Sequence, residues 1–303
     1  MRVPFNALNN ALLPRLQSLA AAQLTATNQL ASGQRVNRPS EDPLAMNRAL
    51  ELEARKKQEQ QYFQNAGRAA DLGQATYAVL ENLNKVSTRA GELSTLAGSL
   101  SSPAELATYA AELDQLIEQG VALGNSKFQG DALFGSTKTD MQAPFSVTRD
   151  QTTNKVSAVS YDGAAGNGAA ISVSDSETVL PGTTGAENAN LAGFLNNLVA
   201  LRNALTGSPL DLTALSAARQ GLNTSEDQIL ASITRISSVQ YRVESAVRQA
   251  SETFQALDKE FGERVDADYA QISLNLSRSQ TAYEAALQSA ARVGTLSLLD
   301  FLR

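Results

Sequence analysis

The amino-acid sequence predicts a mainly α-helical protein with a small β-rich insert. Its long antiparallel helices form a coiled-coil rod, and the N- and C-terminal helices pair at one end. Apolar residues recur at alternating spacings of three and four along most of the chain, as on one face of a helix. Between about residues 128 and 185 this pattern stops, and Gly, Ser, Thr and Asp become frequent. Aromatic residues make up only 5% and Trp is absent, which favours packed helices over a thick globular core.

The first helix is predicted from one seam of mostly apolar side chains. The seam consists of Leu12, Leu16, Leu19, Gln23, Ala26 and Leu30. Gly33 follows it, and glycine is the usual residue in the left-handed turn just past a helix end. The first helix is therefore expected to end at Gly33.

A polar connector follows the first helix. Pro39 disfavours the helical conformation for Arg38, so the chain is expected to be extended there. Ser40 is the expected N-cap of the next helix, and Glu41-Asp42 suits the positive end of that helix. Pro43 is tolerated in a first turn. The stretch therefore predicts a helix, a connector and a second helix.

Two more helices are expected before the β-rich insert. Residues 48–64 are strongly charged, and a seam from Tyr62 to Leu93 continues the second helix to about Ser101. Ser101-Ser102-Pro103 ends that helix and caps another, which Gly124-Asn125 closes.

The β-rich insert is predicted from short runs of β-type residues at 144–149, 155–161 and 170–176, with turn signals at Asp162-Gly163 and Pro181-Gly182. We expect at most four or five strands. Gly163, Gly166 and Gly168 superficially suggest a phosphate-binding loop. No helix or Lys follows them, so a flexible turn is the better interpretation.

Helical periodicity resumes near Asn190 and continues to the end. From Ile229 the seam steps regularly by four and three, but one extra residue between Phe261 and Tyr269 shifts its phase. A change of twist or a joint is expected there. Leu276 and Tyr283 lie on the later part of the seam. The last ten residues gather an apolar tail that predicts self-association: Leu296, Leu298, Leu299, Phe301 and Leu302.

Three kinds of domain follow from this layout. Residues 1–35 and 266–303 are expected to form terminal helical segments, residues 36–140 and 186–265 a helical rod domain, and residues 141–185 the small β-rich insert. The chain runs out along helices, makes a β excursion and returns, so both termini are expected at the same end of the rod.

Composition excludes several classes of site and partner. The 25 basic and 31 acidic residues are interspersed and give a net charge of −6, so neither nucleic acid nor an anionic membrane is an expected partner. No apolar run approaches the roughly 18 residues that a membrane span needs. Without Cys or His there is no thiolate or imidazole metal site, Cys nucleophile or His base. No cofactor is expected. The missing cysteines suit either a cytosolic protein or one exported unfolded, and composition leaves both open.

Four stretches resemble one known family. The run from Leu30 to Ala45, LASGQRVNRPSEDPLA, resembles the signature after the first helix of the flagellin superfamily. Its RVNxPSxDP form is similar to the hook-associated protein 3 branch, the hook–filament junction proteins. The other stretches are NSKFQGDALFG from Asn125 with APF at 143–145, DADYA from Asp266 with LSRSQT at 276–281, and SLLDFL at 297–302.

The resemblance implies a structural component of the bacterial flagellum. Such a protein leaves the cell unfolded through the flagellar type III export apparatus, with an export chaperone on its C-terminal helix. It self-assembles as a ring between hook and filament, where its partners are a neighbouring hook-associated protein and flagellin. The terminal segments form the inner tube, and the connector becomes a joint between helical layers, through Gly33, Arg35, Asn37, Pro39, Asp42 and Pro43. Arg35 and Arg38 beside Glu41 and Asp42 are interpreted either as ion pairs within this joint or as a solvated cluster.

Two alternatives to the junction protein are weighed. The first is a flagellin, which shares the terminal helices but carries a different sequence after the first one. The second is an enzyme that uses Glu263, Asp266 and Asp268 as acid, base or metal ligands. These carboxylates lie in an open helical stretch with no Gly-rich cradle, and most such clusters are solvated faces. We therefore expect no enzyme.

Overall fold

The computed structural model describes the backbone of residues 5–97, 101–207 and 210–301, and within these ranges the side chains from Leu13 to Ala291. Its contacts divide the chain into two compact units, one of residues 1–58 and 253–303 and the other of residues 59–252. Below they are called the terminal unit and the central unit. The division into residues 1–35 with 266–303, 36–140 with 186–265, and 141–185 stays a prediction.

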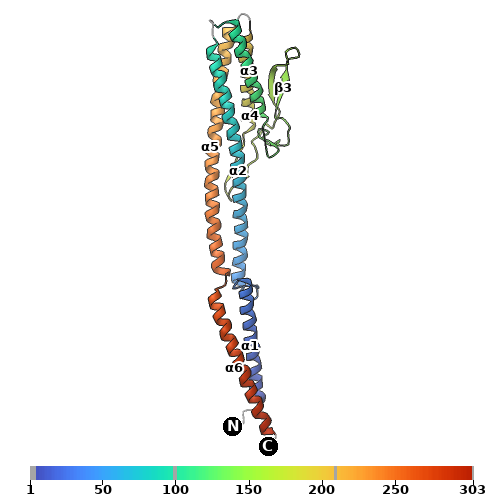
Figure 1. Ribbon diagram of the computed structural model, residues 1–303, viewed down its shortest axis with the longest axis vertical. Coiled ribbons are helices and arrows are strands. Elements are labelled where there is room, and N and C mark those ends of the chain that lie inside the picture. Colours follow the sequence, from blue (N-terminus) through green and yellow to red (C-terminus); the bar gives the residue numbers. More distant parts are fainter. Residues whose placement is uncertain (1–4, 98–100, 208–209, 302–303) are drawn as a thin grey trace. The chain divides into compact units, whose positions relative to one another are not determined.

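The described part of the chain has the expected fold class, mainly α with a small β-rich insert (Figure 1). Its helices are α1 (Phe5–Ser32), α2 (Pro43–Leu96), α3 (Pro103–Gly124), α4 (Gly185–Thr206), α5 (Leu212–Val265) and α6 (Tyr269–Phe301). The joint expected between Phe261 and Tyr269 is confirmed, because α5 ends before α6 begins. The helix cap expected within Ser101-Ser102-Pro103 is also confirmed: Ser102 is the N-cap, and its Oγ accepts the N–H of Glu105 at 3.3 Å.

The terminal unit pairs α1 with α6 in antiparallel fashion (Figure 1). Ala26 of α1, Ile272 of α6 and Ala267, which precedes α6, form a buried cluster, with Leu30 and Leu276 packed against it. Further along, Gln23 donates from Nε2 to the carbonyl of Ser279 at 3.1 Å. This polar contact lies in the apolar seam, where a hydrogen-bonded amide fixes which turns of the two helices face each other.

The α1–α6 pair buries little of its apolar surface. Leu13 and Leu24 on α1 are 61% and 64% exposed, and Leu287 on α6 is 45% exposed. Two helices have only one shared face, so apolar residues on their other faces stay in water unless another helix covers them.

The central unit has a continuous core between helices. Leu80, Leu83 and Val86 of α2 belong to it, with Leu113 of α3 and Leu198 of α4. Their spacing within α2 is that of one helix face. α4 begins at Gly185, five residues before the expected start near Asn190, because Thr184 and Glu187 form a reciprocal capping box.

The expected count of four or five strands is wrong. Residues 101–207, all of which are described, hold six short strands that pair as three antiparallel ladders: β1 (Lys127–Phe128) with β2 (Asp131–Ala132), β3 (Phe145–Arg149) with β4 (Val156–Tyr161), and β5 (Ile171–Ser172) with β6 (Thr178–Val179). Four of these strands have only two residues, which is too short for an alternating pattern to appear in the sequence.

Two asparagines fasten the β3–β4 hairpin to the helices. Asn125, the C-cap of α3, accepts the N–H of Phe145 and donates to its carbonyl, both at 2.9 Å. Asn196 on α4 makes the same two contacts with Val159, at 2.9 and 2.8 Å. Each amide side chain therefore replaces the hydrogen bonds of a missing neighbouring strand.

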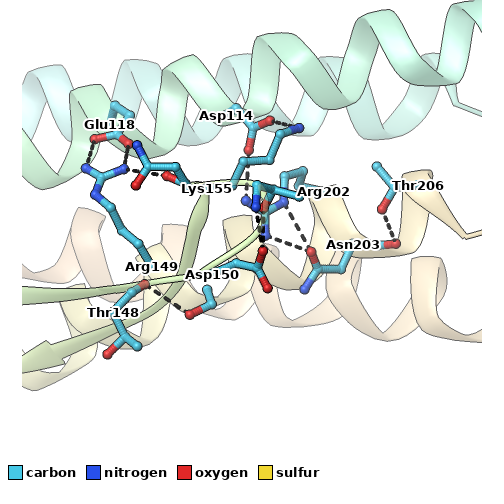
Figure 2. Close-up of polar contacts among 12 residues, drawn as sticks. Asp114, Glu118, Thr148, Arg149, Asp150, Lys155, Arg202, Asn203 and Thr206 are labelled. Carbon is cyan, nitrogen blue, oxygen red and sulfur yellow. Dashed lines mark hydrogen bonds and ion pairs between the residues drawn. The ribbon is translucent and has the colours of Figure 1, made fainter.

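Ion pairs hold the far end of the same hairpin (Figure 2). Arg149 contacts Glu118 of α3 through two hydrogen bonds of 2.5 and 2.9 Å. Asp114 of α3 pairs with Lys155 at 2.5 Å and with Arg202 of α4 at 2.8 Å. The Arg202 side chain is only 7% exposed, so α3, α4 and the hairpin share a buried charge.

Two glycines of the central unit lead to opposite stability predictions. A Cβ at Gly91 in α2 would meet nothing within 4 Å, whereas one at Gly120 in α3 would lie 2.5 Å from Cδ2 of Leu195. Gly91→Ala should therefore raise the free energy of unfolding by about 0.5–1 kcal/mol by removing backbone freedom from the unfolded chain. Gly120→Ala should lower it by about 1–3 kcal/mol through overpacking.

Urea unfolding of the two purified full-length variants beside the parent measures both effects. Equal and same-signed changes for Gly91→Ala and Gly120→Ala would show that the α3–α4 approach is looser than this packing requires.

Candidate functional site: a joint between two helix breaks

The helices of the terminal unit are interrupted twice, once after α1 and once between α5 and α6. Gly33 follows α1 with φ of +71°, and its N–H bonds the carbonyl of Gln29 at 2.9 Å. The left-handed ending predicted at this glycine is confirmed. On the other side, Oδ1 of Asp268 accepts the N–H groups of Ala270 and Gln271 at 3.0 and 3.1 Å, which caps the start of α6.

The two breaks are hydrogen-bonded to each other. The N–H of Arg35 donates to the carbonyl of Val265 at 2.7 Å, and the N–H of Ala267 donates to the carbonyl of Gly33 at 2.9 Å. Gln34 and Asp266 lie opposite each other in this one-pair antiparallel bridge. The backbone groups released where the helices stop therefore satisfy one another.

The remainder of the connector is fixed by side chains that bond its backbone. Oε2 of Glu41 accepts the N–H groups of Asn37 and Arg38 at 3.0 and 3.3 Å. Asp42 caps α2, because its Oδ1 accepts the N–H of Ala45 at 3.0 Å. The expected N-cap at Ser40 is wrong: α2 begins at Pro43, so Asp42 occupies the position just before the first helical residue.

Of the ion pairs considered for the connector, Arg35 with Asp42 is present at 3.6 Å. Their side chains are 49% and 36% exposed, which limits this pair to a small contribution. Arg35 also donates from Nη2 to the carbonyl of Arg264 at 3.1 Å. Pro39 lies exposed in the turn. Hydrogen bonds to the backbone, rather than opposite charges, therefore determine the course of the connector.

Charged and aromatic side chains join α2 to α5 next to the joint. Arg48 bonds Glu260 of α5 and Glu51 of its own helix, each at 2.8 Å. The hydrogen bond from Arg48 lowers the pKa of Glu51. Lys56 pairs with Asp258 and lies over the rings of Phe254 and Phe261, at 5.5 and 4.8 Å from their centres.

A small apolar cavity of about 120 Å³, here called the socket, opens beside the joint. It is lined by Val36 of the connector, Met46 and Ala49 of α2, and Phe261 and Val265 of α5. Gln34, Leu50, Glu53 and Arg264 also border it.

The three carboxylates of the enzyme alternative have separate environments. Asp268 caps α6, Asp266 belongs to the bridge, and Glu263 lies 3.9 Å from Lys259 on its own helix. Within the described residues no group of three His, Cys, Asp or Glu side chains is arranged to hold a metal ion.

The expected assembly residues whose side chains the structure describes lie on the α1–α6 pair. Leu16, Leu19, Leu30, Leu276 and Tyr283 are all half-buried along it. The side chains of Leu12, Leu296, Leu298, Leu299 and Phe301 lie outside the described part, as does Leu302 altogether. No helix in the described ranges is long and apolar enough to cross a membrane.

Sequence reasoning missed the second half of the joint. The residues that bond the connector, Val265 and Ala267, and the charged contacts of Arg48 and Lys56 carry no local signal for these partners. The phase shift near Phe261 was the one sequence feature that indicated a break on that side.

Comparison with known proteins agrees with this architecture. Residues 3–139, a little under half of the chain, match the bacterial flagellin N-terminal helical region. A search among curated protein sequences finds no match.

Two solved structures share the fold. One is a flagellar hook-associated protein from Vibrio parahaemolyticus, with a TM-score of 0.63 and 20% identity over 75% of this chain and 100% of that chain. The other is Bacillus cereus FlgL, with a TM-score of 0.58 and 22% identity over 70% of this chain and 99% of that chain. The N-terminal part of this chain therefore resembles the helical region of bacterial flagellins, and the chain as a whole shares the fold of these two flagellar proteins.

Proposed function

We propose that this chain is a structural subunit of the bacterial flagellum that self-assembles at the hook–filament junction and adapts the hook to the flagellin filament. The observation that carries the proposal is the fold match to a flagellar hook-associated protein over the whole of that protein's length. The exposed apolar faces of α1 and α6 support it, because an isolated chain gains little from keeping such faces in water.

In this proposal the terminal helical segments, residues 1–35 and 266–303, form the inner tube, and the β-rich insert faces outward. Copies form a ring whose neighbours are another hook-associated protein and flagellin. The chain is exported unfolded through the type III apparatus, with a chaperone on its C-terminal helix, and works outside the cell. It acts as a building block and catalyses no reaction.

A flagellin filament subunit is the second candidate, favoured by the matched N-terminal region, whose model describes flagellins. Deleting the gene separates the two candidates under the electron microscope. Loss of a junction protein leaves hooks on the cells and releases flagellin into the medium. If the chain is instead the filament subunit, its loss also leaves hooks on the cells, but no flagellin appears in the medium. Intact filaments after deletion would contradict both.

Removal of residues 294–303 is expected to give a soluble, partly helical monomer that does not assemble. Leu296, Leu298, Leu299, Phe301 and Leu302 are each expected to contribute about 1.5–3 kcal/mol when buried between copies. The measurement is incorporation of the truncated protein into flagella of a deletion strain, with circular dichroism of the purified protein as the control for folding. Normal incorporation would contradict the role given to this tail.

A further inference from the structure

Leu44 is an exposed apolar side chain beside the joint. It is the second residue of α2 and is 82% exposed, the highest value among the large apolar side chains in the described ranges. No part of the terminal unit that the structure describes covers it. A leucine at this position therefore forms an apolar projection, here called the knob.

The socket lies on the other side of the same helix. At 3.6 residues per turn, the α2 residues that line it, from Ala45 to Glu53, centre roughly 170° around the helix axis from Leu44. The knob and the socket therefore point in opposite directions from one helix, and the knob does not reach the socket of its own chain.

The socket fits a side chain of this size. Its volume of about 120 Å³ is somewhat below the roughly 150 Å³ of an apolar protein cavity that binds benzene. The four side-chain carbons of leucine are fewer than the six of benzene. Apolar walls contributed by Val36, Phe261 and Val265 match the chemistry of the knob.

A cation borders the socket, and an exposed carboxylate lies close to the knob in the sequence. On the rim of the socket Glu53 is neutralised by Lys57 at 2.8 Å, whereas the side chain of Arg264 forms no ion pair among the described residues. Glu41, an exposed carboxylate, precedes the knob by three residues. A second chain that brings its knob to the socket also brings this carboxylate toward the guanidinium.

We propose that the occupant of the socket is Leu44 of a second copy of this chain. A surface that carries a projection on one side and its complement on the other makes a head-to-tail contact, which repeats from copy to copy until a ring closes. This inference rests on the proposed function. It identifies the surfaces through which neighbouring subunits of the ring meet beside the joint.

The chain has no cysteine, so introduced thiols report this contact without background. Flagella are isolated from a deletion strain that produces the full chain with Leu44→Cys and Leu50→Cys together, and are treated with a mild oxidant. Leu50 lies at the mouth of the socket and is 56% exposed. The expected result is a ladder of disulfide-linked multimers in a non-reducing gel, absent from either single variant.

The matched control pairs Leu44→Cys with Tyr241→Cys, because Tyr241 is 70% exposed but lies on α5 in the central unit. An equal ladder in the control, or none in flagella that contain the test variant, would overturn the contact. If the unmodified gene fails to restore filaments to the deletion strain, the proposed function fails instead, and the two results are distinguishable.

A second variant keeps the test decisive if the thiol variants do not assemble. Leu44→Asp should leave the melting temperature of the purified chain unchanged, because the side chain is exposed, yet should remove filaments from the cells. Tyr241→Asp, at a similarly exposed position on α5 in the central unit, serves as the comparison and should swim normally. Swimming at the parental rate with Leu44→Asp would overturn the proposal.

Discussion

Replacing Gly33 by valine is expected to abolish swimming in a deletion strain while leaving the central unit folded. The φ of +71° at this position costs a β-branched residue about 1–3 kcal/mol. A Cβ would also lie 2.8 Å from the hydroxyl of Tyr269. The hydroxyl of Tyr269 can move aside, because that side chain is 57% exposed, but relief of the backbone strain moves the carbonyl of Gly33 away from Ala267. The bridge between the two helix breaks then opens.

Gly33→Asn is the matched control, since asparagine adopts the left-handed conformation more readily than valine. Thermal melting of both purified variants is compared with swimming of strains that carry them. The double variant Pro39→Ala, Pro43→Ala tests the same joint from the other end, because it lets the connector become helical. Gross unfolding of Gly33→Val, or normal swimming with both prolines replaced, would show that the connector does not set the geometry of assembly.

Removal of the Arg202 side chain is expected to destabilise the central unit by about 2–4 kcal/mol, because it leaves Asp114 with one partner in a partly buried site. The Asp114 side chain is 22% exposed and keeps only Lys155. Arg149→Ala, in contrast, breaks a pair whose side chains are 40% and 48% exposed, and should cost no more than about 1 kcal/mol.

Urea unfolding of the full chain measures both variants. The double variant Arg202→Met, Asp114→Leu should lose less stability than Arg202→Ala alone, because it removes both charges of the buried pair. If Arg202→Ala costs no more than Arg149→Ala, the network in Figure 2 is a surface feature with no special role at its buried end.

Much of the helical architecture could be predicted because its signals are local. The capping residues Ser102 and Glu105 lie within four residues of each other and indicate the start of α3. Gly33 marks the end of α1. The same capping signature is present at Thr184 and Glu187, but the predicted start rested on helical periodicity, which resumes only near Asn190. At α2, two residues could act as the cap, and the position of Pro43 decided for Asp42 over Ser40.

Only one side of the candidate site, the connector after α1, could be predicted from the sequence. The connector has a recognisable sequence, whereas its partner strand at residues 265–267 does not. A one-pair bridge is too short for alternation, and its two sides are separated by most of the chain. The same reason hides the contacts of Arg48 and Lys56 with α5, since a charged residue on a helix does not show which distant helix it faces.

The bridge between Gln34 and Asp266 also constrains the order in which the chain folds. Closing a flexible loop of this length has an entropic cost of about 5 kcal/mol, which two backbone hydrogen bonds do not offset. The intervening central unit is continuous in sequence and forms its own core, so its prior folding shortens the loop that remains to be closed. Contacts between distant parts of a chain form slowly for the same reason. In pulsed hydrogen exchange, the amides of Leu80 and Leu113 should therefore gain protection before those of Arg35 and Ala267. The two sides of the bridge therefore meet last, after the central unit between them has folded.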